Sequence, residues 1–299
     1  MEKRIDGKAI SKELYKELKN YLLKYDKLPT IVDISIGDDY GGLMYSKMKQ
    51  RKINQETGIC FESIHFDTIT YEKLIEYIIS LNNNNDINGI MLQLPLPDYL
   101  KEREREILDT INQGKDVDGL TAISSGLLAV GNDTFVPCTA LGIEVLLKSY
   151  NVNLQGKNIA IINRSNIVGK PLSFLMLKDN ATPTLCHSKT NNLKDITNKA
   201  DIVVAALNKK EFITSDYIKE GAIVIDVGVH QGDEGKVVGD VNFKDVYKKA
   251  SLITPPIGAV GPMTICMLAY NAAKSMYGSE VNDVLESGIS KVKKLTNQK

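Results

Sequence analysis

The chain alternates short apolar runs with longer segments whose apolar residues recur at helical spacing. Its first half holds three strand-like runs, TIVDISI (30–36), CFESIHF (60–66) and GIMLQL (89–94). Two segments with helical periodicity, LMYSKMKQRKINQ (43–55) and YEKLIEYIISL (71–81), separate these runs. Parallel strands need a crossover of about this length, so the order predicts a mostly parallel sheet in an α/β fold.

A second series of the same kind follows the helical segment LGIEVLLKSY (141–150). It contains a further helical segment, residues 166–178, with Pro171 in its first turns, where proline is tolerated. This pattern predicts a Rossmann-like unit of the dinucleotide-binding kind. Its strand-like runs are KNIAII (157–162), TPTLC (182–186), DIVVAAL (201–207) and AIVIDV (222–227).

The length of 299 residues allows two domains. We expect residues 139–264 to form the dinucleotide-binding domain. Residues 1–138 and 265–299 are expected to form the other, N-terminal α/β domain. The return to the first domain is expected because no strand follows the apolar helical segment at 265–277.

The composition is that of an ordinary soluble protein, with 43% apolar and 25% charged residues. Lys and Arg number 37 and so do Asp and Glu, so net charge gives no reason to expect nucleic acid or a membrane surface as a partner. The start MEKRIDGKAISKEL lacks an apolar signal core, and no run approaches the roughly 18 apolar residues of a membrane span. A cytoplasmic location is therefore expected.

The cysteines and histidines show no metal-ligand spacing. No two cysteines form a CxxC pair, and no histidines form an HxxxH or HExxH pattern. We therefore expect unpaired thiols and no metal site. The residues concerned are Cys60, Cys138, Cys186, Cys266, His65, His187 and His230.

Tyr45 and Lys49 are four residues apart, so they lie on one face of the expected helix. Such pairs are common on solvated helices, and the spacing alone favours no function. Short-chain dehydrogenases also carry a YxxxK pair, but there the glycine-rich turn comes first. Here the pair precedes the nucleotide-binding turn by more than a hundred residues, which argues against that family.

Three further stretches suggest a ligand site, although each taken singly is more typical of an ordinary loop. QLPLP (93–97) places Gln93 at the carboxyl end of a strand, where ligands bind in α/β proteins. KDVDG (115–119) offers Asp118 in a turn, and PPIGAVGPMT (255–264) is a Pro/Gly loop with exposed backbone.

Together these stretches resemble the bifunctional methylenetetrahydrofolate dehydrogenase/cyclohydrolase family. The resemblance runs from IDGKAIS near the start to GPMT near residue 264. Other segments that carry it are IGDD, YSKMK, NGIMLQLPLP, KDVDGLT, FVPCT, RSNIVGKP, CHSKT, IKEGAIVIDVG and KVVGDV.

The resemblance implies roles for individual residues. Tyr45 would pack on the folate, Lys49 would act in proton transfer, and Gln93 would adjust that lysine. Asp118 would anchor the pterin, and the GP pair Gly261–Pro262 would also contact the substrate. The first domain would thus bind folate and carry the catalytic groups.

The chemistry of the reaction is consistent with these roles. A carboxylate such as Asp118 can accept charge-assisted bonds from the amino group and ring N–H of a pterin. Hydride loss from the methylene group leaves a methenyl cation, which water must attack with loss of a proton. A lysine accepts that proton only if its pKa is lowered, because a free lysine is protonated at neutral pH. Gln93 is expected to hold the amine without charge, since an acid in its place would stabilise the ammonium.

The nucleotide-binding turn departs from the pattern of the family. Asn163 stands where the family has the first glycine after the strand, and Asn208 replaces a second glycine. Asparagine enters the left-handed region more readily than most residues, so we expect both turns to keep their backbone shape. The added side chains are expected to weaken cofactor binding, and Asn163→Gly is expected to tighten it by about 1 kcal/mol.

The expected cofactor is NADP. An NAD site usually has an acid after the second strand, but this chain has CHSKT (186–190) there and Arg164 in the first turn. The alternative is that Arg164 and Lys189 are solvated surface charges. His187 is expected to be structural. The residues proposed to bind the cofactor are Asn163, Arg164, Ser165, Val168, Ser188, Asn208 and Val229.

We therefore expect an enzyme that oxidises 5,10-methylenetetrahydrofolate with NADP and hydrolyses the methenyl product to 10-formyltetrahydrofolate. One alternative is a cyclohydrolase with weak or lost dehydrogenase activity, because both turns lack a glycine. Another is a folate-binding protein without turnover, against which the Lys49 and Gln93 pair argues. The family also implies a homodimer.

Overall fold

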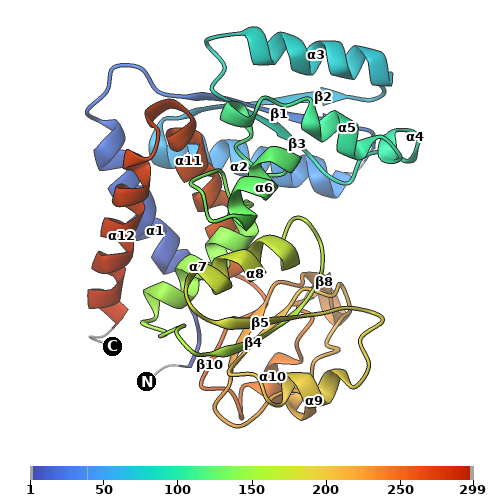
Figure 1. Cartoon of the computed structure of the whole chain (residues 1–299), viewed down its shortest axis with the longest axis vertical. Coiled ribbons are helices and arrows are strands. Elements are labelled where there is room, and N and C mark those ends of the chain that lie inside the picture. The colour runs from blue at the N-terminus through green and yellow to red at the C-terminus, as the bar shows by residue number, and fades with distance from the viewer. Residues whose placement is uncertain (1–2, 39, 297–299) are drawn as a thin grey trace. The chain divides into compact units, whose positions relative to one another are not determined.

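The structure, a computed structural model, describes residues 3–38 and 40–296. These residues form two compact units (Figure 1). The three-stranded unit comprises Leu14–Cys138 and Ile265–Gly288. The five-stranded unit comprises Thr139–Thr264 with the chain up to Glu13 and from Ile289 onward. The assignment of a separate function to each domain stays a prediction.

The three-stranded unit is built on a parallel sheet of order β2-β1-β3. Its strands are β1 (Thr30–Ile36), β2 (Cys60–Phe66) and β3 (Gly89–Leu92). The first two match the expected strands, and β3 ends two residues before the apolar run does. The parallel α/β arrangement expected from the alternation of elements is thereby confirmed.

The two faces of this sheet carry different residues, because successive side chains of a strand point to opposite sides. On one face, Val32, Ile34 and Ile36 of β1 join a buried cluster with helix α3 (Tyr71–Asn83). On the other face lies helix α2 (Tyr40–Thr57) (Figure 1). The carboxylate of Asp33 therefore lies on the face of the sheet that α2 covers, opposite the apolar cluster.

Shorter helices and the two terminal helices complete the unit. Tyr270 donates its hydroxyl to the Leu14 carbonyl at 2.9 Å, and Gly288 packs against the Leu14 side chain. These contacts bring the C-terminal helices onto α1, as the sequence predicted. The helices are α1 (Gly7–Leu22), α4 (Asp98–Lys101), α5 (Glu104–Asp109), η1 (Gln113–Lys115), α6 (Ala122–Ala129), α11 (Val260–Tyr277) and α12 (Glu280–Thr296).

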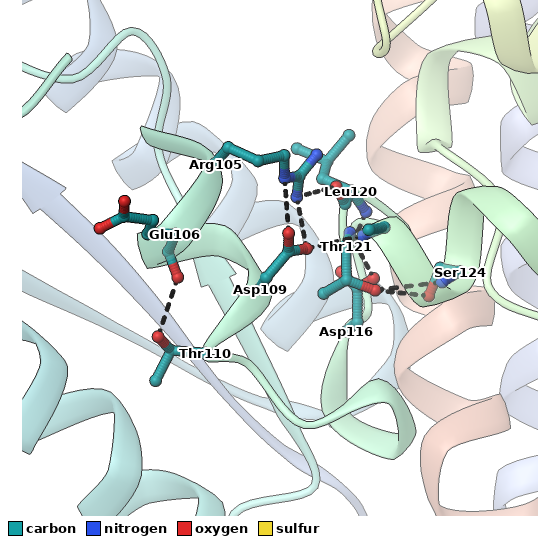
Figure 2. A network of polar contacts seen from close by, with 9 residues as sticks. Arg105, Glu106, Asp109, Thr110, Asp116, Leu120, Thr121 and Ser124 are labelled. Atoms are coloured by element: carbon teal, nitrogen blue, oxygen red, sulfur yellow. Dashed lines mark hydrogen bonds and ion pairs between the residues drawn. The ribbon is translucent and has the colours of Figure 1, made fainter. Parts of the chain in front are cut away.

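A network of side-chain bonds to the backbone fixes the turn that contains Asp118 (Figure 2). The Asp116 carboxylate accepts from the backbone N–H groups of Leu120, at 3.0 Å, and Thr121, at 2.9 Å. Arg105 donates to the Leu120 carbonyl at 2.7 Å and to both oxygens of Asp109. Asp116 is thus occupied in holding the turn.

The five-stranded unit has a parallel sheet of order β10-β7-β6-β4-β5. The chain passes from β4 to β5 on one side and then crosses back to β6 on the other side. In such sheets ligands bind where the strand order reverses, beyond the carboxyl ends of the strands. The strands are β4 (Asn158–Ile162), β5 (Thr182–Cys186), β6 (Ile202–Ala205), β7 (Ile223–Asp226) and β10 (Leu252–Ile253).

Helices and a small hairpin surround this sheet. Helix α8 begins at Gly169, three residues later than the expected segment, and carries Pro171 in its first turn. The remaining elements are α7 (Cys138–Ser149), α8 (Gly169–Lys178), α9 (Leu193–Thr197), η2 (Ser215–Tyr217), β8 (His230–Gln231), η3 (Asp233–Gly235), β9 (Val237–Val238) and α10 (Phe243–Val246).

Across residues 3–38 and 40–296, every helix is too short or too polar to cross a membrane. In the same part of the chain, no three His, Cys, Asp or Glu side chains are grouped to hold a metal ion. All four cysteines are free of disulfide bonds, and Cys60 is the exposed one among them.

Candidate functional site

The structure brings Lys49, Gln93 and Tyr45 together in the three-stranded unit. The Lys49 ammonium donates to Gln93 Oε1 at 2.8 Å and lies 3.4 Å from Met91 Sδ. It also lies 5.4 Å from the centre of the Tyr45 ring. Only 1% of Lys49 is exposed, so these neighbours replace its water. We call Lys49 and its neighbours the lysine cluster.

Backbone geometry explains why these side chains meet. Gln93 directly follows β3, and its N–H donates to the Ile34 carbonyl at 2.8 Å, which fixes it beside β1. Tyr45 and Lys49 lie one turn apart on α2, so both project from the same face of that helix. The cluster therefore combines a helix face with the carboxyl end of a strand.

The cluster also contains Asp33, which the sequence analysis did not identify. Its carboxylate lies 3.2 Å from the Lys49 ammonium, and it is completely buried. Ser46 donates its hydroxyl to the same carboxylate at 2.5 Å. Gln93 holds the amine as expected, but an acid also lies beside the lysine, because Asp33 reaches it from β1. An aspartate in the middle of a buried, mostly apolar strand was the signal in the sequence.

Asp118 lies close enough to this cluster for electrostatic interaction with Lys49. Burial by the surrounding protein raises the pKa of Asp118 to about 7, and the nearby Asp116 and Asp33 add to this effect. The Lys49 ammonium and a hydrogen bond from Cys138 act in the opposite direction on that pKa. The carboxyl group of Asp118 therefore changes its charge near neutral pH.

The hydroxyl of Tyr45 keeps its proton at neutral pH. Burial is the main cause that raises the pKa of its hydroxyl, and electrostatic interaction with Cys138, Asp118 and Asp33 raises it further. Its ring is therefore a neutral aromatic surface beside Lys49, suited to packing against a flat ligand.

In the five-stranded unit, the Asn163 side chain is bonded inside the turn that follows β4. Its Oδ1 accepts from the N–H groups of Ser165, at 2.7 Å, and Gly169, at 3.1 Å. Its Nδ2 donates to the Ala206 carbonyl at 2.6 Å, beyond the end of β6. The amide thus links the two strand ends between which the strand order reverses.

The backbone of Asn163 differs from the expectation. Its φ is not positive, so the idea that Asn163 keeps a left-handed glycine conformation is wrong, whereas Asn208 does have a φ of 55°. The position in this turn that requires a glycine is Gly169, whose backbone lies against that of Asn163. A Cβ added to Gly169 would overlap the Asn163 carbonyl. Ser165 also braces the turn, with its Oγ accepting from the Val168 N–H at 3.1 Å.

The loop that contains Asn208 is held by Asp240, to which the sequence analysis assigned no role. The buried Asp240 carboxylate accepts from the N–H groups of Leu207, at 2.7 Å, Asn208, at 3.2 Å, and Lys209, at 2.7 Å. His230 lies 2.8 Å from the same carboxylate. The signal in the sequence was the family-like stretch KVVGDV, which contains Asp240.

The other residues proposed to bind ligands lie in the five-stranded unit as follows. Val168 is buried, Ser165 is half-buried, and the side chains of Arg164, Ser188 and Val229 are exposed. Gly261 and Pro262 lie in the first turn of α11. His187 accepts from the Lys189 N–H at 3.1 Å, which is a structural contact within the loop. The exposure of Arg164 fits a phosphate ligand and a solvated charge equally well.

Comparison with known proteins places the chain in a family. A model for the catalytic domain of tetrahydrofolate dehydrogenase/cyclohydrolase matches residues 5–118, and a model for the NAD(P)-binding domain of the same family matches residues 137–279. The chain belongs to the tetrahydrofolate dehydrogenase/cyclohydrolase family. The family, the two-part α/β fold and the enzyme class predicted from the sequence are thereby confirmed.

Individual relatives agree with this membership. The bifunctional protein FolD of Bacillus licheniformis is 47% identical over 276 residues, which cover 91% of this chain and 96% of the relative. The crystal structure of the bifunctional FolD enzyme of Campylobacter jejuni is 41% identical with a TM-score of 0.86, covering 91% of this chain and 97% of that one. The Trypanosoma brucei FolD, crystallised with NADP and an inhibitor, is 33% identical with a TM-score of 0.85, covering 91% and 96%.

The hydrogen bonds of the Asn163 side chain reverse the expectation that Asn163→Gly would tighten cofactor binding. Asn163→Gly would leave two N–H groups and one carbonyl without their partner. On the expectation that this turn binds the dinucleotide, binding would then also have to order the turn. We now expect the dissociation constant of NADP to rise about 5- to 30-fold, equivalent to ~1–2 kcal/mol. Titration of both proteins with NADP measures this.

Asn166→Gly is the matched control, because it adds a glycine to the same turn but removes only an exposed contact with Lys170. We expect it to change the dissociation constant less than about twofold. Tighter binding by Asn163→Gly would contradict our interpretation and would mean that Asn163 Oδ1 competes with the ligand for the two N–H groups.

Proposed function

We propose that this chain oxidises 5,10-methylenetetrahydrofolate with NADP and hydrolyses the methenyl product to 10-formyltetrahydrofolate at the lysine cluster. The observation that carries this proposal is the buried Lys49 ammonium, held by Gln93 at 2.8 Å. Binding a folate needs no buried amine, whereas proton transfer during hydrolysis does. This argues against a folate-binding protein without turnover.

Lys49 is the group proposed to exchange the proton in the hydrolysis step. Water that attacks the methenyl carbon must lose a proton, and the amine form of Lys49 can accept it. The cation of the bound intermediate disfavours a second positive charge beside it and so promotes this amine form. Gln93 orients the amine through Oε1 and adds no net charge.

Asp118 and Tyr45 are proposed to bind the folate itself. As a carboxylate, Asp118 accepts two hydrogen bonds from the amino group and ring N–H of the pterin. The neutral ring of Tyr45 offers a packing surface close to Lys49. Gly261 and Pro262 remain proposed substrate contacts on the basis of the family pattern.

The turn from Asn163 to Gly169 and the start of helix α8 are proposed to bind NADP, which accepts the hydride when it is bound. The turn fits a pyrophosphate in its position, because it lies at the reversal of strand order and leads into the positive end of a helix. Residues 186–190, at the end of β5 and directly after it, include no carboxylate, so a 2′-phosphate would meet no acidic side chain there. Arg164 in the turn after β4 is exposed and available to pair with that phosphate. We therefore propose NADP rather than NAD.

A cyclohydrolase with weak dehydrogenase activity is the second candidate. It is favoured by the Asn163 side chain, whose Oδ1 already occupies the N–H groups of Ser165 and Gly169. Titration with NADP and with NAD, followed by assays of methenyl formation, separates the two candidates. The homodimer and the cytoplasmic location implied by the sequence remain proposals of the same kind.

Lys49→Met tests the proposed function, because it keeps the length of the side chain and removes the amine. We expect hydrolysis of the methenyl substrate to fall by about a hundredfold or more, in the range for loss of a general base. Oxidation of the methylene substrate should fall less, since hydride transfer needs no proton acceptor. The decay and the formation of methenyl absorbance measure the two activities, and unchanged decay would rule out the role of Lys49.

The charge of Asp118 predicts how folate binding depends on pH. The carboxylate is the form that accepts two bonds, and its ionised fraction falls as the pH drops below about 7. Folate affinity should therefore decrease about fivefold between pH ~7 and pH ~6, since about half of the group is ionised at its pKa and about a tenth one unit below it. Folate titrations at a series of pH values measure this.

Asp118→Asn removes the titrating group and keeps its shape. We expect weaker folate binding, by ~1–3 kcal/mol, with little change across the same pH range. A variant that keeps the pH dependence of the parent chain would show that another group titrates. If NADP affinity fell and folate affinity held, Asp118 would belong to the other ligand.

A further inference from the structure

Asp33 is a buried carboxylate on the middle strand of the three-stranded sheet. In the register of the strands it lies between Ser63 of β2 and Met91 of β3. Its Oδ2 receives the hydroxyl of Ser46 and faces the Lys49 ammonium at 3.2 Å. Its Oδ1 has no hydrogen-bond partner among the described residues. A carboxylate without exposed surface is costly unless it is paired, so its pairing with Lys49 needs a reason.

We propose that Asp33 is a positioning residue that holds the Lys49 ammonium and sets the pH range in which Lys49 can act as a base. This inference rests on the role of Lys49 under the proposed function. It assigns a task to Asp33, which the mechanism above leaves unused.

The position of Lys49 depends on contacts from different strands. Asp33 attracts the ammonium from β1, while Met91 of β3 and Gln93 just beyond β3 contact it from the adjacent strand. A long flexible side chain is thereby restricted to one location, which general-base catalysis requires. Loss of Asp33 would leave a buried ammonium with only neutral partners at bonding distance.

The charge of Lys49 depends on the groups that face it. Tyr45 on the same helix is neutral, and Cys138 at the start of α7 has a thiol whose pKa burial raises. Asp118, in the turn after η1, interacts with Lys49 but forms no ion pair within 4 Å among the described residues. Asp33 is therefore the acid in direct contact, and an opposite charge so close stabilises the ammonium form.

Two opposing influences then determine when the free amine exists. Asp33 favours the ammonium, and the methenyl cation of the substrate favours the amine. The carboxylate also offsets the charge of Lys49, which reduces the repulsion of a cationic substrate. If Asp33 is removed, the amine should form at lower pH.

Asp33→Asn tests this inference, because asparagine keeps the shape and removes the charge. We expect the rising limb of the hydrolysis rate against pH to move by about one to three pH units towards lower pH, the range for loss of a close opposite charge. Both rates are measured at saturating folate, because Asp33 also raises the pKa of the folate-binding Asp118. Under that condition the pH profile of the dehydrogenase step should not move. Asp86→Asn is the control, because it removes an exposed ion pair with Lys27 on the same unit and should move neither profile.

An unmoved limb in folded Asp33→Asn would overturn the inference, even if its rate were lower. If Lys49→Met kept its hydrolysis rate, the proposed function of the lysine would fail instead, so the two failures are distinguishable. If Asp33→Asn does not fold, the charge state of Lys49 in the parent chain is measured instead. The carbon-13 chemical shift of Lys49 Cε reports that charge, and its signal is assigned by comparison with Lys49→Met. An ammonium at neutral pH without substrate supports the ion pair, and a neutral amine overturns it.

Discussion

Burial of the Lys49 ammonium is the constraint on which the three-stranded unit depends. An ammonium without water must find partners, and they come from the adjacent strands β1 and β3 and from the segment after β3. These contacts connect helix α2 to one face of the sheet, while apolar packing secures α3 on the other face. Because Asp33 and Gln93 are on different chain segments, the lysine is positioned by the fold itself, and not by its helix alone.

Much of the fold was predictable because short apolar runs alternate with segments of helical periodicity, and this order leaves a clear pattern. Three strands, at 30–36, 60–66 and 182–186, have the expected bounds. The two-residue strands β8, β9 and β10 are too short to show any period. The contact of Asp33 with Lys49 was not predicted for a different reason. A sequence pattern shows that a strand is buried, but it does not show which side chain of a helix lies against a given residue of that strand. The pairing of Lys49 with Gln93 was accessible through family resemblance, whereas the pairing with Asp33 required three-dimensional contacts.

The five-stranded unit shows how a turn can do without its usual glycine. Asn163 was expected to imitate the backbone of glycine, but its contribution is a side-chain amide that joins Ala206 to the N–H groups of the turn. Asn208 does adopt a positive φ, and the Asp240 carboxylate holds its loop by accepting hydrogen bonds from the backbone N–H groups. The sequence identified both positions as departures, but it gave no information on which of the two would use its backbone and which its side chain.

The central claim is that one folate site, built around Lys49, serves both oxidation and hydrolysis. The most direct test measures the inhibition constant of one unreactive folate analogue against each activity of the parent chain, with NADP present in both assays. A single site predicts that the two inhibition constants agree and that inhibition is competitive with folate in both cases. Constants that differ by about tenfold or more, equivalent to ~1.4 kcal/mol, would mean that the two reactions use separate sites and would contradict the account.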